Sequence, residues 1–206
     1  MNIYTYPLGL LGTNCYLIEE NGAVIIVDPG GEASEVIRFI EERSFQVEAI
    51  LLTHAHFDHI GGVDQVRGHF NVPVYIHAEE ADWLTTPELN GSKKFQVGEV
   101  KTSVGADHYI QEGKTSIGQF SFEVLYTPGH SPGSISFFFE NNSTLIAGDT
   151  LFQGGIGRTD LPFGDHHTLI SSIKTKIMNL PEDTQVYPGH GPKTSVQKEV
   201  NNPFLV

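Results

Sequence analysis

The sequence predicts an α/β fold in which short strands alternate with helices. Apolar runs rich in β-branched residues, such as 23–27 and 47–52, are typical of buried strands. Between these two runs, apolar residues recur at helical spacing over residues 32–43. With 206 residues the chain is long enough to bury its own core, as one domain or as a tightly fused pair of half-domains. We take residues 1–206 as a single domain.

The first half of the chain divides into short elements with clear apolar patterning. Asn21-Gly22 is typical of a two-residue hairpin turn and separates two of the strands. Residues 85–105 are the least periodic part of the chain, and we expect a loop or lid there whose role the sequence does not indicate. The predicted strands are 3–6, 13–18, 23–27, 47–52 and 73–77, and the predicted helices are 32–43, 63–70 and 78–84.

The second half continues the alternation around a glycine-rich loop over residues 151–165. Asp165 is the expected N-cap of the helix that follows this loop. Thr194, with Gln197 three residues later, forms a capping-box pattern that predicts the start of a final helix. The predicted strands are 106–110, 120–126, 134–139, 144–147 and 184–187, with a helix over 166–180.

Composition excludes several classes of partner and location. The formal net charge of −13 argues against a broad nucleic-acid surface, which needs a basic footprint. No run reaches the 18 or so apolar residues of a membrane helix, and the N-terminus lacks a secretory signal pattern. The single cysteine, Cys15, rules out an internal disulfide and fits a reducing compartment. We therefore expect a cytoplasmic protein without nucleic-acid or membrane partners, and the composition does not indicate an oligomeric state.

A histidine-rich segment, Thr-His-Ala-His-Phe-Asp-His-Ile-Gly-Gly over residues 53–62, follows the strand 47–52. Residues two apart in an extended chain point to the same side, so His54 and His56 can bind one ion together. Asp58 and His59 follow as the chain turns and face a second position. Imidazole nitrogens with a carboxylate oxygen are the ligands of zinc-like or iron-like divalent ions. A polar loop rich in histidine is the alternative, but this order at a strand end favours a metal site.

Three further strand ends carry side chains of the same kind. Pro-Gly-His tripeptides end at His130 and His190, and each follows a predicted strand. Proline fixes one dihedral angle and glycine permits the turn, so each histidine is presented at a strand end. Asp149 follows another apolar strand. One tripeptide alone would be weak evidence, but four strand ends together predict a shared site.

The seven candidate ligands divide into two metal positions with one carboxylate between them. His54, His56 and His130 would hold the first ion, Asp58, His59 and His190 the second, and Asp149 would bridge both. Each ion would keep one position open for water, as a catalytic site requires. Two ions roughly 3.5–4 Å apart would share that water as a bridging hydroxide, because they lower its pKa towards ~7. Zinc is the expected metal, and iron and manganese also accept these ligands.

These motifs, with Gly-Asp-Thr-Leu-Phe around Asp149, resemble the metallo-β-lactamase superfamily and, within it, the glyoxalase II-like (hydroxyacylglutathione hydrolase-like) branch. The resemblance extends from Asp28 to Gly191. It implies an αββα sandwich of two mixed β-sheets flanked by helices, and hydrolysis of a thioester such as S-D-lactoylglutathione. The family's seven metal ligands match the seven residues above, and Asp28 matches a carboxylate that orients a ligand histidine.

Two features differ from the longer glyoxalase II enzymes and bear on the substrate. Those enzymes add a C-terminal helical domain that holds part of glutathione, and we expect this chain to be a short form without it. They also carry a lysine and a tyrosine where this chain has Arg158 and Asp160. Arg158 either pairs with a substrate carboxylate or forms a salt bridge to Asp160 or Asp165 that shapes the loop. Lys193 is either a second cationic contact for substrate or a solvated surface lysine.

The expected reaction is metal-assisted hydrolysis of a small-molecule thioester, in which Asp58 orients the hydroxide while it remains a ligand. The main alternative is an oxidoreductase similar to persulfide dioxygenases, which use one iron bound by two histidines and a carboxylate. The complete second set of ligands, which includes His190, favours the hydrolase. A binding or regulatory protein without turnover is disfavoured because no ligand is missing.

Overall fold

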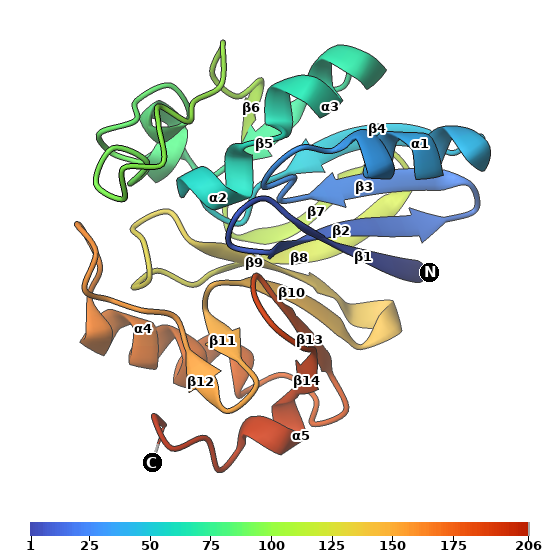
Figure 1. Ribbon diagram of the computed structural model, residues 1–206. Helices are drawn as coiled ribbons and strands as arrows, with labels where there is room; N and C mark the ends of the chain where they lie inside the picture. The colour runs from blue at the N-terminus through green and yellow to red at the C-terminus, as the bar shows by residue number, and fades with distance from the viewer. Residues whose placement is uncertain (206) are drawn as a thin grey trace. The chain divides into compact units, whose positions relative to one another are not determined.

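The computed structural model describes residues 1–205 as two compact units, each with a six-stranded β-sheet (Figure 1). Unit 1 comprises Met1–Ile110 and Ile117–Phe120, and unit 2 comprises Gln111–Ser116 and the chain from Ser121 onward. Val206, the last residue of the predicted domain, lies outside the described residues.

The sheet of unit 1 is mixed. Its first three strands pair antiparallel, and each later strand pairs parallel with the one before it. Asn21 and Gly22 both have positive φ angles, 48° and 84°, as the predicted hairpin turn requires. In order across the sheet, the strands are β1 (Asn2–Leu8), β2 (Thr13–Glu20), β3 (Ala23–Val27), β4 (Gln46–Leu51), β5 (Val74–Ile76) and β6 (His108–Tyr109).

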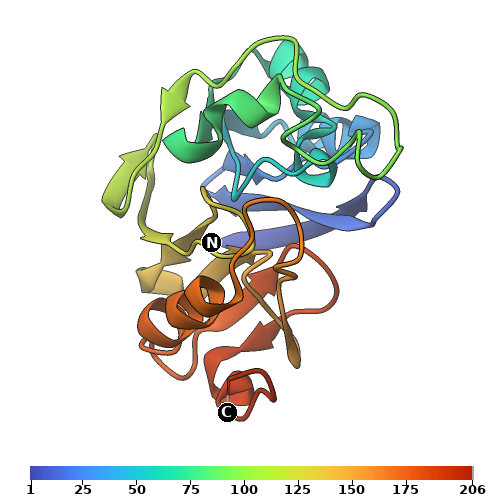
Figure 2. The ribbon, with the colours of Figure 1, turned by 90° about the vertical axis from the view of Figure 1, so that its left-hand side faces the viewer.

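Helices α1 (Ser34–Glu42) and α3 (Val63–Phe70) lie over this sheet (Figure 1). Val36 of α1 and Val66 of α3 are buried in one apolar cluster with Ile26 and Ile50 of the strands. The short α2 (Phe57–Ile60) precedes α3, and the 3₁₀ helix η1 (Ala78–Leu84) follows β5. Residues 85–105 contain no helix or strand, as expected, and Figure 2 shows them as an irregular green loop.

The sheet of unit 2 is also mixed, because β10 and β13 pair parallel while the other recorded neighbours pair antiparallel. A separate two-stranded hairpin, β11 (Leu151–Phe152) and β12 (Gly155–Ile156), follows β10. In order across the sheet, the strands are β14 (Thr194–Ser195), β13 (Gln185–Pro188), β10 (Thr144–Gly148), β9 (Ile135–Phe139), β8 (Phe120–Tyr126) and β7 (Gly113–Ile117).

Helix α4 (His166–Ser172) continues into a π-helical turn, η3 (Ile173–Ile177), and together they cover the predicted helix as far as Ile177. Asp165 caps α4 as predicted, because its carboxylate accepts a hydrogen bond from the Thr168 N–H at 2.7 Å. Leu169 of α4 packs in one apolar cluster with Leu145 of β10 and Val186 of β13. The 3₁₀ helix η2 (Glu140–Asn142) joins β9 to β10, and α5 (Val196–Glu199) follows β14.

The predicted combination of two mixed β-sheets with flanking helices is confirmed. The capping-box prediction is wrong by one residue, since Ser195 is the N-cap of α5 and the Thr194 hydroxyl donates instead to Glu199 at 2.6 Å. No helix within residues 1–205 combines the length and apolar character needed to cross a membrane.

Candidate metal centre

The histidine-rich segment of unit 1 lies between β4 and α2. His54 and His56 are buried, and their ring centroids are 4.9 Å apart. His56 is the N-cap of α2 with φ −63° and ψ 149°, so the chain is extended there before the helix begins. Each of the two imidazoles offers a nitrogen within 4.8 Å of the other. The structure therefore brings these two side chains together, as their spacing predicts.

Asp58 and His59 come from the first turn of α2 and join the same group. The ring centroids of His54 and His59 are 4.0 Å apart. His59 Nε2 lies 3.5 Å from Asp58 Oδ2. Four of the seven predicted ligands thus form one cluster within unit 1.

Asp28, at the end of β3, fixes the orientation of this cluster. Its carboxylate is 1% exposed and accepts the Thr53 N–H at 2.8 Å and the Thr53 hydroxyl at 2.6 Å. The same carboxylate lies 2.9 Å from His59 Nδ1, so Nδ1 carries the proton and Nε2 is left as the electron-pair donor. Because the Thr53 hydroxyl proton points to Asp28, its oxygen accepts from His54 Nδ1 at 3.1 Å. His54 therefore also presents Nε2.

Glu80 in η1 is a buried carboxylate that sequence reasoning missed. It is fully buried, and its Oε2 accepts the Ala55 N–H at 2.6 Å. Ala55 separates His54 from His56, so this bond holds the peptide that connects the two imidazoles. The sequence offers no signal for this role, because Glu80 is one of two adjacent glutamates in a short helix.

Glycines let the backbones around this cluster touch directly. A Cβ at Gly30 would lie 1.8 Å from the Asp58 carbonyl oxygen, and a Cβ at Gly62 would lie 2.1 Å from the Gly31 carbonyl oxygen. Neither distance is possible for a side chain. The loop after β3 and the turn after α2 can therefore pack together only with glycine at these positions.

Unit 2 holds the other three predicted ligands in a second cluster. His130 follows β8, Asp149 follows β10, and His190 follows β13. Asp149 Oδ2 lies 3.6 Å from His130 Nε2 and 3.5 Å from His190 Nε2. His130 Nδ1 donates to the Arg158 carbonyl oxygen at 2.8 Å, so this imidazole also presents Nε2.

The donor chemistry of both clusters fits a divalent metal ion. Separations of 3.5 and 3.6 Å between Nε2 and Oδ2 are too long for good hydrogen bonds. Two ligands that each lie about 2.0–2.2 Å from one ion are about 3–3.5 Å apart, close to these values. Three of the histidines present Nε2 because a protein group occupies Nδ1, which is the usual arrangement for histidine ligands. The residues present are therefore suited to hold zinc, iron or manganese.

Arg158 forms the ion pair that was one of its two predicted roles. Its Nε and Nη2 atoms each donate to Asp160 at 2.7 Å, and the side chains are 52% and 67% exposed. The hydrogen bonds that Arg158 donates to Asp160 raise the pKa of Arg158 above its usual range. Lys193 is exposed, and its ammonium lies 5.6 Å from the centroid of the Tyr187 ring. Contact of either side chain with substrate remains a prediction.

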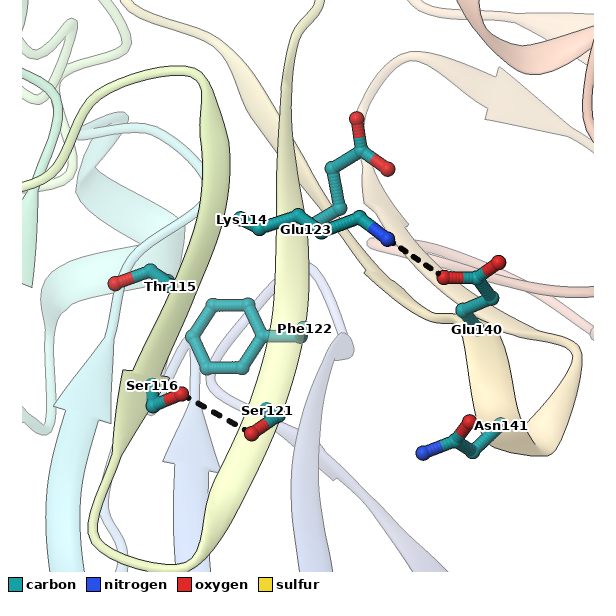
Figure 3. Close-up of a pocket in the computed structure, with 8 residues that line it drawn as sticks. All are labelled: Lys114, Thr115, Ser116, Ser121, Phe122, Glu123, Glu140 and Asn141. Carbon is teal, nitrogen blue, oxygen red and sulfur yellow. Dashed lines mark hydrogen bonds and ion pairs between the residues drawn. The ribbon is translucent and has the colours of Figure 1, made fainter.

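A cavity of about 380 Å³ in unit 2 lies away from these ligands in the sequence, over the β7–β8 hairpin and η2 (Figure 3). An ion pair between Lys114 and Glu140 at 3.0 Å and a hydrogen bond between Ser116 and Ser121 at 3.0 Å border it. None of its lining residues is a predicted ligand or substrate contact. This cavity therefore does not define the metal centre.

The family and its curated members match nearly the whole chain. The family model described as the metallo-beta-lactamase superfamily matches residues 8–190. The chain is 48% identical over 201 residues to the probable metallo-hydrolase YqgX of Bacillus subtilis (strain 168), covering 97% of this chain and 95% of that protein. It is 40% identical over 210 residues to the hydroxyacylglutathione hydrolase GloC of Haemophilus influenzae, covering 100% of this chain and 98% of that protein.

Two solved structures share both fold and sequence with this chain. The BLEG-1 B3 metallo-beta-lactamase has a TM-score of 0.97 and 47% identity, with 100% of each chain covered. TTHA1623 in a di-iron-bound form has a TM-score of 0.87 and 34% identity, with 97% of this chain and 98% of that chain covered. The chain therefore belongs to the metallo-β-lactamase superfamily, as a metallo-hydrolase with a candidate set of histidine and aspartate ligands.

Proposed function

We propose that this protein is a dinuclear metal-dependent hydrolase of thioesters such as S-D-lactoylglutathione. One observation supports the dinuclear part: Asp149 Oδ2 lies 3.6 Å from His130 Nε2 and 3.5 Å from His190 Nε2. A carboxylate close to one histidine from each proposed ion position is suited to bind both ions. The full-length likeness to a hydroxyacylglutathione hydrolase supports the thioester part.

The proposed ligands are those expected from the sequence. His54, His56 and His130 hold the first ion, Asp58, His59 and His190 hold the second, and Asp149 bridges them. Zinc is our first choice of metal, because nitrogen-rich sets with one or two carboxylates suit it. Iron is the main alternative, supported by the di-iron form of a structural neighbour, and manganese fits the same donors.

Bound divalent ions would supply an activated water at neutral pH and polarise the thioester carbonyl. Asp58 would accept a hydrogen bond from the attacking water and orient it, which makes Asp58 the proposed catalytic residue. The only thiol of the chain, Cys15, is no candidate nucleophile, because it is fully buried in β2 and burial raises its pKa. We therefore place the chemistry on oriented water, without a thiol nucleophile.

The proposed partner is a small-molecule thioester, with no nucleic acid and no membrane involved. Arg158 would bind a substrate carboxylate if it exchanged its exposed pairing with Asp160 for the ligand. Lys193 would add a second, weaker cationic contact. A cytoplasmic location is proposed from cysteine usage alone.

Hydrolysis of a β-lactam amide is a second candidate. One observation favours it: the likeness to the BLEG-1 B3 metallo-beta-lactamase at a TM-score of 0.97. Water activated at two metal ions can attack either carbonyl, so the two candidates differ only in how substrate is held. The thioester ranks first because the chain is 40% identical, over 100% of its own length, to a protein named as a hydroxyacylglutathione hydrolase.

The deciding experiment compares three substrates on protein purified without added metal. Its metal content is measured by elemental analysis, thioester cleavage of S-D-lactoylglutathione by thiol release, β-lactam cleavage with nitrocefin, and oxygen uptake with glutathione persulfide. The proposal expects about two ions per chain and thiol release without oxygen uptake. The Asp149→Ala protein, purified in the same way, controls for contaminating enzymes.

Each other outcome rejects a stated part of the proposal. Nitrocefin cleavage without thioester cleavage would make the protein a β-lactamase. One iron per chain with oxygen consumption would make it an oxidoreductase similar to persulfide dioxygenases. Two ions without any of the three activities would reject the thioester as substrate and retain the metal assignment.

A further inference from the structure

Thr13, the first residue of β2, contacts a proposed metal ligand through its side chain. It is fully buried, and its hydroxyl donates to Asp58 Oδ2 at 2.7 Å. The same oxygen lies 3.5 Å from Nε2 of His59, the next proposed ligand. The Thr13 hydroxyl therefore binds the carboxylate oxygen that faces the proposed second ion position.

We propose that Thr13 is a positioning residue, whose hydroxyl fixes the Asp58 carboxylate in the orientation that binds the second ion. This inference rests on the proposed function in so far as Asp58 is a metal ligand. The terminal torsion of an aspartate side chain is broad, so a carboxylate needs an anchor to stay in one orientation. Asp58 lies in a helix of only four residues, and its side chain is 12% exposed. Packing alone does not enclose it.

The backbone around Thr13 is built for this contact. Thr13 pairs with Leu8 in the β1–β2 ladder, which fixes its main chain. A Cβ at Gly30 would lie 3.2 Å from Thr13 Cβ and 1.8 Å from the Asp58 carbonyl oxygen. The missing side chain at Gly30 therefore leaves room for Thr13 and Asp58 to approach. A β-branched side chain also has few rotamers, so the hydroxyl direction is well defined.

A purely structural hydrogen bond is the alternative, and the chain contains a matched example. Thr194 is 2% exposed, and its hydroxyl donates to the buried Glu199 carboxylate at 2.6 Å. Glu199 is not a proposed ligand. A loss of stability alone is therefore expected from Thr194→Val, whereas Thr13→Val should change metal binding as well.

The test measures the affinity of both Zn²⁺ equivalents by competition with a chromophoric chelator, independently of activity. Thr13→Val, which keeps the shape and removes the hydroxyl, should weaken one of the two equivalents by about 10–100-fold, the usual effect of losing a group that orients a ligand. Thr13→Ser, which restores the hydroxyl, should recover affinity to within a few-fold of wild type. Thr194→Val should leave both affinities unchanged. If Thr13→Val does not fold, Thr13→Ala takes its place.

The outcomes separate this inference from the proposed function. Wild-type affinity for both equivalents in the folded Thr13→Val protein would overturn the positioning role. Equal losses in Thr13→Ser and Thr13→Val would also overturn it, because the hydroxyl would then not be the cause. If the wild-type protein binds two ions but does not cleave thioesters, only the proposed substrate is rejected. The Zn²⁺ affinities of the Thr13 variants then still decide the positioning role. If the wild-type protein binds only one ion and Thr13→Val binds that ion with the same affinity, both the dinuclear site and the positioning role of Thr13 are rejected.

Discussion

Replacement of Asp28 by asparagine should weaken the binding of one metal ion while the fold survives. The buried Asp28 carboxylate accepts a hydrogen bond from His59 Nδ1 at 2.9 Å, which leaves Nε2 of His59 as the nitrogen that can bind a metal. An amide of the same shape presents an NH₂ group in place of one oxygen. If that group faces His59, Nδ1 must accept a hydrogen bond, and the proton moves to Nε2. An imidazole protonated at Nε2 cannot bind a metal through that atom.

The expected loss of stability in Asp28→Asn follows from the hydrogen bonds that the Asp28 carboxylate accepts. Its carboxylate accepts three hydrogen bonds of 2.6–2.9 Å, and an asparagine can keep the one from the Thr53 N–H. Hydrogen bonds to a charged group contribute about 1.5–3 kcal/mol, and a weaker replacement recovers part of this. We expect the free energy of unfolding of the metal-free protein to fall by about 1–3 kcal/mol. The affinity for one Zn²⁺ equivalent should fall about 10–100-fold, which is about 1.4–2.7 kcal/mol.

The assay combines urea unfolding of metal-free protein with Zn²⁺ competition against a chelator. Asp107→Asn is the matched control, because Asp107 Oδ2 accepts from Arg67 at 2.9 Å and from the Val74 N–H at 2.8 Å and contacts no proposed ligand. It should lose stability without losing Zn²⁺ affinity. Wild-type affinity for both equivalents in Asp28→Asn would refute the reasoning from the His59 tautomer.

Three further predictions follow from the remaining contacts. Asp149→Ala should lower the occupancy of both ions and abolish thioester cleavage with the fold retained; two ions and near-normal activity, by elemental analysis and thiol release, would contradict the bridging role. Arg158→Ala should raise KM for S-D-lactoylglutathione with little change in kcat, a loss of about 1–3 kcal/mol if the contact is direct; equal effects on substrates with and without the terminal glycine carboxylate would show that Arg158 does not bind it. Gly62→Ala should strongly lower Tm, because its Cβ would lie 2.1 Å from a carbonyl oxygen. Gly68→Ala in α3, where nothing lies within 4 Å, should instead stabilise by about 0.5–1 kcal/mol; equal Tm changes would show that the close packing around Gly62 is not what requires glycine.

Sequence patterns predicted the elements with a strong apolar signal. The predicted ranges for β3, α3 and β8 match the observed bounds, because each combines a regular period with turn residues at its ends. The strand β7 (Gly113–Ile117) was missed because its sequence, Gly-Lys-Thr-Ser-Ile, is mostly polar and it pairs at the edge of its sheet. Edge strands need only one partner, so they can form without an apolar run. The two-residue strands of β11 and β12 are too short to leave any pattern.

The candidate ligands were predictable because the chemistry requires histidine and aspartate at strand ends, and these stand out in a sequence. The residues that orient them were not, with the exception of Asp28. Thr13 and Asp58 are 45 positions apart, and Ala55 and Glu80 are 25 apart. A threonine or glutamate has many ordinary roles, and only the folded chain shows which one touches a ligand.

The burial of charge in unit 1 gives the metal a role in stability as well as in chemistry. Asp28 and Glu80 are 1% and 0% exposed, and Asp58 is 12% exposed, so three carboxylates lie largely out of water in one part of unit 1. The hydrogen bonds that these carboxylates accept do not remove their charge, and like charges in a low dielectric repel. A divalent cation would balance that charge in the folded state alone, so binding should raise the free energy of unfolding by about 2.7 kcal/mol at 100 times the dissociation constant. Thermal melts with Zn²⁺ in excess and with a chelator should therefore differ by several degrees. Equal melting temperatures would mean that the protein already balances these carboxylates by itself.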